Sequence, residues 1–402
     1  MEICKEKECT GCMACVNACP VSALSINIDS KGFYIPLVDE NKCIHCNKCF
    51  NVCPNNSPIS NNKQPLDVYA LWSKDKNIRS KSTSGGIFTG LAKWIIEHNG
   101  YVFGAVLEDG IVKHSKINRI EDINLLRGSK YVQSYIGDSF KLAKEVLDLG
   151  EHVLFSGTPC QIAGLYNYLG KKEYDNLLTM DIVCHGVPSP KAFKDYYEYM
   201  RDTFKSDIKD LKFRYKKPSW TRFSMKINFA NDKIYVKGCD KDPYLVAFLS
   251  DYISRDCCHD CKFTNVSRVA DLTAADFWSY VSTSKKYRND EKGISLVLIN
   301  SLKGKELFDE IKKEYVIQNK TLDEAKRGNR CLSRPYPAAK EKNEFWERYL
   351  NTNDLIATVN TFCPKRKVNI KHLISEEINR YFYLLPKPIK NRLNKFYAKK
   401  VN

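Results

Sequence analysis

The chain has 402 residues, of which 43% are hydrophobic and 28% charged, a composition typical of a globular protein with one large core or two smaller ones. No apolar run reaches the roughly 18–20 residues of a membrane-spanning helix. The start MEICKEKEC lacks the apolar core of a signal peptide. We therefore expect a cytoplasmic protein rather than a membrane-spanning one.

The formal net charge is +17, and a strongly basic balance is typical of proteins that bind nucleic acid or an anionic membrane. No nucleic-acid-binding motif accompanies the charge, so we expect no nucleic-acid partner. Much of the excess lies in residues 365–402, which contain eleven Lys or Arg against Glu376 and Glu377. This stretch predicts a basic helical extension over 346–402. It is either a solvated tail or a contact for an acidic protein or a peripheral membrane surface.

Two copies of one cysteine pattern dominate the start of the chain, CTGCMACVNACP over 9–20 and CIHCNKCFNVCP over 43–54. Between them, LSINI and FYIP flank the turn residues DSKG and predict a β-hairpin. The polar stretch NNSPISNNKQP that follows has no apolar period. We therefore predict a small domain over 1–60 and a linker over 61–66.

From residue 67 onward, strand patterns alternate with helix patterns. The segments VYALW, YVFGAVL, HVLFSGTP and GISLVLINS predict strands, whereas GIFTGLAKWIIEH, SFKLAKEVLDLG, QIAGLYNYLG and KGKELFDEIKKE have helical apolar spacing. This alternation predicts a larger α/β domain with an N-terminal part over 67–150 and a C-terminal part over 151–345. The predicted fold class is mixed α/β (α+β), with a small bacterial-ferredoxin-like domain followed by the larger one.

The seventeen cysteines indicate metal binding, because disulfide-rich chains are typically short and secreted, and these cysteines have regular CxxC spacing. The run C-x2-C-x2-C-x3-C-P is typical of two-cluster 4Fe-4S domains, in which the fourth cysteine of each run binds the other cluster. Zinc is an alternative, although zinc sites generally use two pairs. The predicted ligands are Cys9, Cys12, Cys15 and Cys53 for one 4Fe-4S cluster, and Cys43, Cys46, Cys49 and Cys19 for the other.

Further cysteines lie far from these runs. The stretch DCCHDCKF over 256–263 offers a CxxC pair, but a cluster or a zinc ion needs four ligands. Cys160 and Cys184 each follow a predicted strand, where α/β sheets collect functional groups. Small buried thiols, a catalytic thiol at Cys160 and zinc are alternatives. We expect a third 4Fe-4S cluster with the ligands Cys160, Cys184, Cys258 and Cys261, with Cys257 as a neighbour or substitute.

Five blocks in order, STSGGIFTGLAKWIIEHNGYVFGAV, GSKYVQS, LFSGTPCQIAGL, DIVCHGVPSP and ADLTAADFW, resemble the coenzyme F-420 hydrogenase/dehydrogenase beta-subunit family. The resemblance implies an iron–sulfur flavoprotein oxidoreductase. Such a protein binds FAD and passes electrons between clusters and a two-electron carrier, either coenzyme F-420 or an unidentified small molecule. Similar bacterial proteins are often encoded beside polysaccharide biosynthesis enzymes, which suggests an acceptor in that chemistry.

The resemblance also implies flavin contacts. The STSGG block precedes a predicted helix and offers hydroxyls and backbone amides to a phosphate, although ordinary helix capping explains it equally well. No acid–base pair or nucleophile motif stands out, so no catalytic residue is assigned. The candidate FAD-binding residues are Ser82, Thr83, Ser84, Gly85, Gly86, Lys130, Tyr131, Gln133, Thr158 and Gln161.

Two functions are consistent with these features. The first is a redox enzyme that exchanges single electrons with a donor or acceptor protein and passes pairs to a small molecule through FAD. The second is an electron-transfer subunit that feeds a partner hydrogenase, dehydrogenase or reductase and has no substrate of its own.

Overall fold

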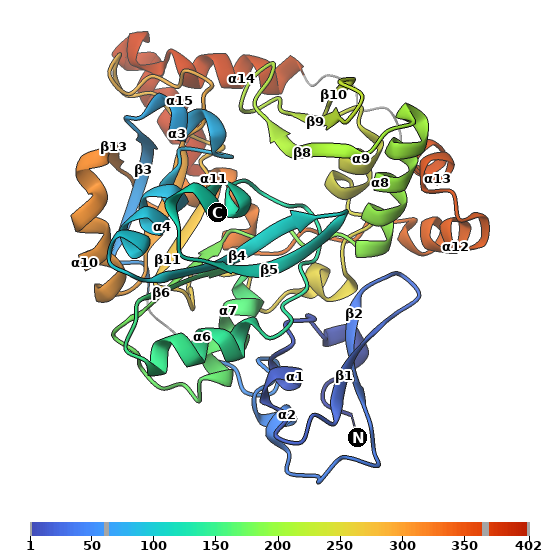
Figure 1. Ribbon diagram of the computed structural model, residues 1–402. Helices are drawn as coiled ribbons and strands as arrows, with labels where there is room; N and C mark the ends of the chain where they lie inside the picture. The colour runs from blue at the N-terminus through green and yellow to red at the C-terminus, as the bar shows by residue number, and fades with distance from the viewer. Residues whose placement is uncertain (1, 60–63, 364–369, 400–402) are drawn as a thin grey trace.

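The computed structural model describes residues 2–59, 64–363 and 370–399, so part of the predicted linker lies outside the described residues. Its centre is an eight-stranded mixed sheet (Figure 1). The neighbours β4, β6, β7 and β11 run parallel, and the other pairs are antiparallel. In spatial order the strands are β13 (Tyr315–Asn319), β3 (Asp67–Ser73), β12 (Ser295–Ile299), β11 (Leu272–Asp276), β7 (Leu177–Ile182), β6 (Val153–Gly157), β4 (Tyr101–Glu108) and β5 (Ile111–Ile117).

Helices cover both faces of this sheet because side chains alternate along each strand. In β6, Leu154 packs beneath α4 and α10, whereas Val153 and Phe155 face α6 and α7 on the other side. The strands and helices predicted over 67–345 are present, which confirms the mixed α/β class. The helices of this part are α3 (Lys76–Lys81), α4 (Ile87–Glu97), α5 (Ile123–Leu126), α6 (Ser139–Asp148), α7 (Pro159–Tyr168), α10 (Leu302–Ile311) and α11 (Leu322–Gly328).

A second, three-stranded antiparallel sheet lies beside the main one, and its strands were not predicted. It shares a core with α8 (Pro190–Phe204), α9 (Pro243–Leu249), α12 (Lys342–Thr352) and α13 (Leu355–Phe362). The predicted start of the C-terminal extension at residue 346 falls inside α12, where Phe345, Trp346 and Tyr349 are buried. The strands are β8 (Ile208–Tyr215), β9 (Ser224–Phe229) and β10 (Ile234–Gly238).

The N-terminal segment contains the predicted hairpin, formed by β1 (Leu24–Ile28) and β2 (Tyr34–Val38), with α1 (Ala14–Ala18) and α2 (Lys48–Asn51) beside it. It packs directly on α6 and α7 (Figure 1). Cys12, Met13 and Ala14 belong to the same buried cluster as the sheet-facing side of those helices. The segment is therefore fixed against the larger part of the chain.

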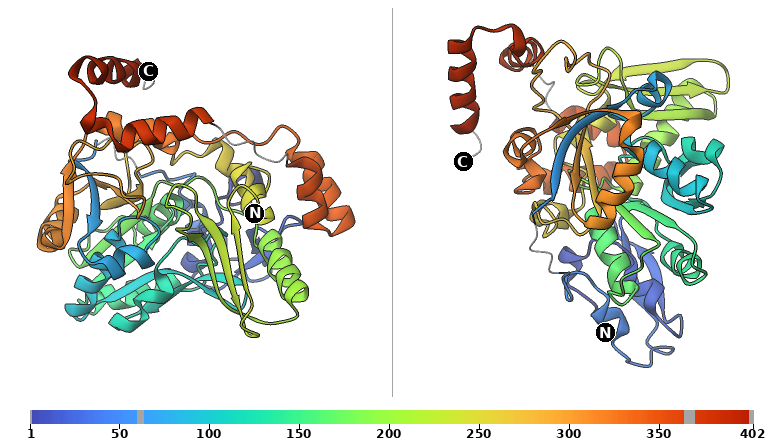
Figure 2. Two further views of the ribbon diagram at one scale, coloured as in Figure 1. Left: turned by 90° about the horizontal axis from the view of Figure 1, so that it is seen from above. Right: turned by 90° about the vertical axis from the view of Figure 1, so that its left-hand side faces the viewer.

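The C-terminal helices α14 (Ile370–Arg380) and α15 (Lys387–Lys399) lie at the edge of the molecule, and α15 extends away from it (Figure 2). Among the helices that the structure describes, none is both long enough and apolar enough to cross a bilayer. The helical character predicted for this region is present. Its role as a contact surface stays a prediction.

We predict that Phe155→Ala lowers the free energy of unfolding by about 3–5 kcal/mol, because the cavity left behind cannot close. Phe155 is fully buried, with its ring centroid 5.5 Å from those of Phe103 and Phe140. Urea denaturation followed by circular dichroism measures the change. The control Leu149→Ala removes a leucine that is 77% exposed and should stay within about 0.5 kcal/mol of the parent. Equal effects of the two changes would contradict the assigned core.

Candidate functional site

All four cysteines predicted for one N-terminal cluster line a single cavity of about 400 Å³, here called the N-terminal cavity. Cys9 and Cys12 come from the loop before α1, Cys15 from α1, and Cys53 from the turn after α2. Cys53 therefore crosses from the second cysteine run to the first, as expected for a two-cluster arrangement. The assignment of these thiols as ligands stays a prediction that their common cavity supports.

A fifth cysteine, Cys4, also lines the N-terminal cavity. Its thiol interacts with those of Cys9 and Cys53 and lowers the pKa of Cys9 to about 6 and of Cys53 to about 7, against the opposing effect of burial. Thiolates are the form that binds iron, so both positions are suited to ligation. Sequence reasoning left Cys4 unassigned. Its position five residues ahead of the first motif was the available signal.

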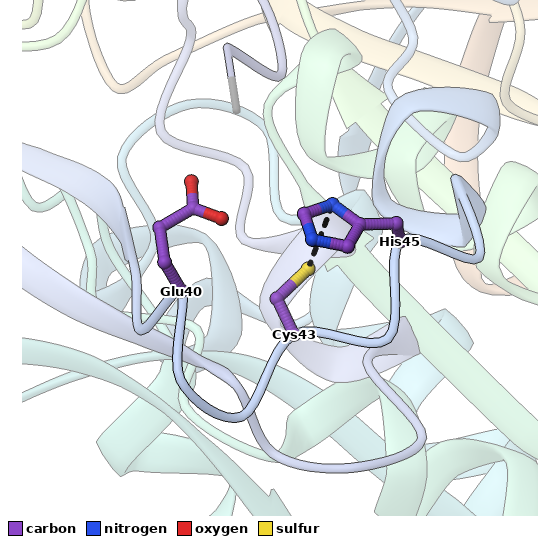
Figure 3. A group of neighbouring side chains, drawn as sticks. All are labelled: Glu40, Cys43 and His45. Atoms are coloured by element: carbon purple, nitrogen blue, oxygen red, sulfur yellow. Dashed lines mark hydrogen bonds between the residues drawn. The ribbon is translucent and has the colours of Figure 1, made fainter.

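The second predicted cluster draws on the other four cysteines. Cys19 and Cys46 both raise the pKa of Cys49, after the larger effect of its burial, so these three thiols lie near one another. The backbone N–H of Ala23 donates to the Cys19 sulfur at 3.2 Å. Cys43 lies beside His45, with 3.9 Å between its sulfur and Nδ1 (Figure 3).

The distal cysteines converge on a second cavity of about 470 Å³, here called the sheet-edge cavity. Cys160 begins α7 directly after β6, and Cys184 follows β7. Since β6 and β7 are adjacent and parallel, their carboxyl ends meet at one edge of the sheet. Cys258 and Cys261 reach the same place from the 3₁₀ turn Asp256–Asp260 and the residue after it. The four predicted ligands are thus brought together.

Two more cysteines line the sheet-edge cavity, Cys257 and Cys331. Cys257 was expected as a neighbour of the site, whereas Cys331 was left unassigned. Cys331 is buried in the short turn Arg330–Leu332, and its thiol adds to the rise in the pKa of Cys261, after the larger effect of burial. Cys331 lies seventy residues after the CxxC pair, so its sequence position did not indicate that it lines the same cavity.

The spacing of the sulfur atoms does not suit a single zinc ion. Tetrahedral Zn–S bonds of about 2.3 Å place sulfurs roughly 3.8 Å apart. Within residues 2–59, 64–363 and 370–399, the one trio of metal-binding side chains with ligand atoms inside 4.8 Å is Glu40, Cys43 and His45 (Figure 3). Among these residues, no three cysteine sulfurs of either cavity lie that close together, which favours a cluster over a zinc ion.

A buried ion pair between Arg268 and Asp181 links the loop after Cys261 to the sheet. Arg268 donates from Nη2 to Asp181 Oδ2 at 2.9 Å and to the Ile182 carbonyl at 2.9 Å, beside Cys184. Its other nitrogen, Nη1, donates to the carbonyls of Phe263 and Asn265, just after Cys261. The Arg268 and Asp181 side chains are 1% and 0% exposed, so bulk water does not screen the pair. Arg268 therefore sets the distance between Cys184 and the CxxC pair.

The predicted flavin-binding residues fall into two groups. In the first, Gly86 adopts a left-handed conformation (φ 103°) at the start of α4, and Ser82 and Thr83 hydrogen-bond to Ile78 and Ser129. The amide of Gly85 donates to Ser295 Oγ at 2.8 Å. Ser84 Oγ is buried without a hydrogen-bond partner among the described residues. Ser84 is therefore the residue of this block that is free to bind a ligand.

The residues of the second group hydrogen-bond to other parts of the protein. Lys130 donates to the Leu125 carbonyl at 2.8 Å, and burial lowers its pKa to about 7. Gln161 closes the capping box of α7 with Thr158. Gln133 hydrogen-bonds to the backbone of Thr10 and Tyr34 in the N-terminal segment. These contacts show where the side chains lie, and their assignment to flavin stays a prediction.

Tyr131 contacts Arg214, a residue that the sequence analysis did not identify. Its hydroxyl accepts from Arg214 Nη1 at 3.0 Å, and the same nitrogen donates to Asp276 at 2.9 Å. Arg214 is 4% exposed at the side chain, yet its Nε and Nη2 have no partner among the described residues. Lys216, which directly follows β8, donates to the Ser84 carbonyl at 3.1 Å. Unpaired buried donors are costly, so Arg214 and Ser84 fit a ligand rich in acceptors.

Comparison with known protein families identifies two segments of the chain. Residues 8–57 match the family described as 4Fe-4S dicluster domain, which makes the chain an iron–sulfur protein. Residues 150–325 match the family described as the C terminus of the beta subunit of coenzyme F420 hydrogenase/dehydrogenase. The chain therefore contains a 4Fe-4S dicluster segment followed by a segment of this hydrogenase/dehydrogenase beta-subunit family, which confirms the resemblance found in its sequence blocks.

No curated protein matches the chain. Among solved structures, it is similar to a chain of the F420-reducing [NiFe] hydrogenase complex from Methanosarcina barkeri, with 20% sequence identity and a TM-score of 0.45. That similarity covers 72% of this chain and 92% of the other.

We predict that Arg268→Met lowers the free energy of unfolding by about 3–5 kcal/mol, because it leaves the Asp181 carboxylate buried without its partner. The double change Asp181→Leu/Arg268→Met removes both charges and should recover much of that loss. Thermal and urea unfolding of the two variants measure the difference. A single variant as stable as the parent would show that the pair does not hold the loop.

Proposed function

We propose that this protein is an iron–sulfur flavoprotein oxidoreductase. It would pass electrons between two N-terminal 4Fe-4S clusters, a third cluster in the sheet-edge cavity and FAD, which exchanges electron pairs with coenzyme F-420 or another small molecule. The observation that carries the proposal is the convergence of Cys160, Cys184, Cys258 and Cys261 on one cavity. The residues fit a cluster because four thiols line one cavity, and among the described residues no three of them bring their sulfur atoms within 4.8 Å of one another, as a zinc site would.

The two cavities are neighbours. Thr10 lines both of them, so one residue borders both sets of cysteines. A Cβ added to Gly164 in α7 would lie 3.1 Å from the Cys12 sulfur, so the helix that begins with Cys160 also covers the N-terminal cavity. Electron transfer requires short, fixed separations between centres, and the shared core of Cys12 with α6 and α7 supplies that rigidity.

FAD, when bound, supplies the ability to accept electrons singly and release them in pairs. In this proposal the hydroxyl of Ser84 and the free nitrogens of Arg214 hold it, with the backbone of Gly85 and Gly86 close by. Arg214 Cζ lies 4.9 Å from the centroid of the Trp278 ring, and Trp278 is 38% exposed. Trp278 therefore offers an aromatic surface on the solvent side of this proposed FAD site.

In this proposal, the second N-terminal cluster would exchange electrons with a protein partner. Cys46 is exposed, and Ile44 and Phe50 beside it are 59% and 46% exposed. Exposed apolar side chains around a redox centre are suited to brief contact with a one-electron donor or acceptor protein. This surface also favours the second candidate function, an electron-transfer subunit that feeds a hydrogenase, dehydrogenase or reductase.

The basic C-terminal helices are a separate candidate contact. Lys387 and Arg392 of α15 are exposed, and the neighbouring apolar residues Leu384 and Ile389 are exposed as well. This combination is typical of helices that dock on an acidic protein or an anionic membrane surface.

We predict that Cys160→Ser removes about four iron atoms per chain and leaves the N-terminal clusters in place, because each 4Fe-4S cluster contains four. Iron and sulfide analysis after anaerobic purification measures this, with about twelve iron atoms expected in the parent. Cys239→Ser, at a half-buried cysteine outside both cavities, is the control and should keep the parent's iron content. Unchanged iron in Cys160→Ser would overturn the ligand assignment.

For the flavin, we predict that Arg214→Lys weakens FAD binding by about a hundredfold or more. The change keeps a positive charge beside Asp276 but removes the two unpaired donors, each worth about 1.5–3 kcal/mol to a charged acceptor. Titration of the deflavinated protein with FAD, followed by fluorescence, measures the affinity. Arg222→Gln is the control, because Arg222 is exposed. Equal affinity in Arg214→Lys and the parent would place FAD elsewhere.

A further inference from the structure

Arg255 lies at the boundary between the N-terminal segment and the sheet-edge cavity. Its backbone N–H donates to the Val187 carbonyl at 2.9 Å, and its carbonyl accepts from the N–H of Cys258 at 3.0 Å. Val187 and Cys258 both line the sheet-edge cavity. The backbone of Arg255 is thereby fixed next to the predicted ligands of the third cluster.

The side chain of Arg255 reaches in the other direction, into the N-terminal segment. Its Nε donates to the Cys9 carbonyl at 2.7 Å, and Nη1 donates to the Tyr34 carbonyl at 3.1 Å and to Gln133 Oε1 at 3.3 Å. The guanidinium also lies over the ring of Phe33, 5.2 Å from its centroid. One side chain therefore links the backbone of a ligand in the N-terminal cavity to the rim of the sheet-edge cavity.

This cation has no carboxylate partner among the described residues, although it is only 4% exposed. The adjacent acid, Asp256, is paired with Lys31 at 2.9 Å and Lys342 at 2.6 Å instead. A buried charge without a counter-ion is costly in free energy. Arg255 lies beside predicted ligands on both sides, since its Nε donates to the Cys9 carbonyl and its own carbonyl accepts from the Cys258 N–H.

We propose that Arg255 is the shared counter-charge of two clusters, the one in the N-terminal cavity and the one in the sheet-edge cavity. This inference rests on the proposed function, because it requires both clusters. A 4Fe-4S cluster with four thiolate ligands is anionic and becomes more so when it is reduced. A buried cation between two such centres favours the reduced state of each, and the low local dielectric strengthens the effect. Arg255 is a positioning residue and touches no substrate.

The geometry also explains why arginine, and not lysine, occupies this position. The hydrogen bonds to Cys9, Tyr34 and Gln133 use two nitrogens of the planar fork, which a single ammonium cannot reproduce. Gly11 allows this close approach. Its φ is +66°, and a Cβ there would lie 2.2 Å from Gln133 Nε2 and 3.1 Å from Arg255 Nη1.

The test is a redox titration of the full-length, anaerobically purified protein, followed by electron paramagnetic resonance. We expect Arg255→Gln to shift the midpoint potentials of two clusters to more negative values and to leave that of the third signal unchanged. The Cys160→Ser variant identifies which signal belongs to the sheet-edge cavity. Arg255→Lys keeps the charge and should shift both potentials less than Arg255→Gln.

Lys262→Gln is the matched control. It removes one positive charge at the same boundary, where Lys262 pairs with Glu8 at 3.1 Å, but its side chain is 57% exposed and screened by solvent. We expect no shift. If Arg255→Gln loses iron, Gln133→Glu serves as the test variant instead. That nearly isosteric change places a carboxylate beside Arg255, which neutralises its charge and should shift the same two potentials.

The outcomes separate this inference from the proposed function. About eight iron atoms per chain in the parent would remove the third cluster and the proposed function with it. About twelve iron atoms, with potentials in Arg255→Gln or Gln133→Glu that match the parent or shift for only one cluster, would overturn the shared counter-charge alone.

Discussion

The sheet-edge cavity depends on one buried ion pair, Arg268 with Asp181. Asp181 lies at the end of β7, three residues before Cys184, and Arg268 lies seven residues after Cys261. The pair therefore joins the two stretches of chain that carry the distal cysteines. Because the carboxylate is fully buried, its burial raises its pKa and the arginine opposes that rise. The loop can leave the sheet only by exposing or protonating this charge.

The same boundary fixes the N-terminal segment. A ferredoxin-like domain on a flexible tether would meet the rest of the chain at variable distances. Here Cys12 and its neighbours are part of the core beneath α6 and α7, and Asn17, Ser57 and Lys31 make hydrogen bonds across the boundary. The packing that stabilises the fold is thus also what sets the separation of the two cysteine-lined cavities.

Buried cations are a recurring feature of these cavities. Arg268 lines the sheet-edge cavity, Arg255 is bonded to two residues that line it, and Arg214 lies between Tyr131 and Asp276. The basic composition, which first suggested nucleic acid or membranes, thus has a second source apart from the C-terminal helices. Thiolate-ligated clusters and flavin phosphates are anionic, so buried arginines are suited to both.

The sequence by itself determined the local features. It predicted the dicluster motifs, the hairpin, the strands and helices over 67–345 and the family, because each depends on residues close together in the chain. It also predicted that Cys160, Cys184 and the CxxC pair would meet, because β6 and β7 were recognisable as strands that end at functional loops. The sheet β8–β10 was missed, since its hydrophobic pattern is interrupted by charged residues such as Lys212 and Lys226 on its exposed face.

Only the tertiary structure decided the roles of Cys4, Cys331, Arg255 and Arg214. Each is an ordinary residue in its local sequence and acquires its surroundings from segments up to 246 positions away, as the hydrogen bond between Arg255 and Cys9 shows. It also decided that Gln133 and Gln161 hydrogen-bond within the protein. Charge compensation and hydrogen-bond satisfaction are properties of three-dimensional neighbourhoods, and no spacing rule along the chain encodes them.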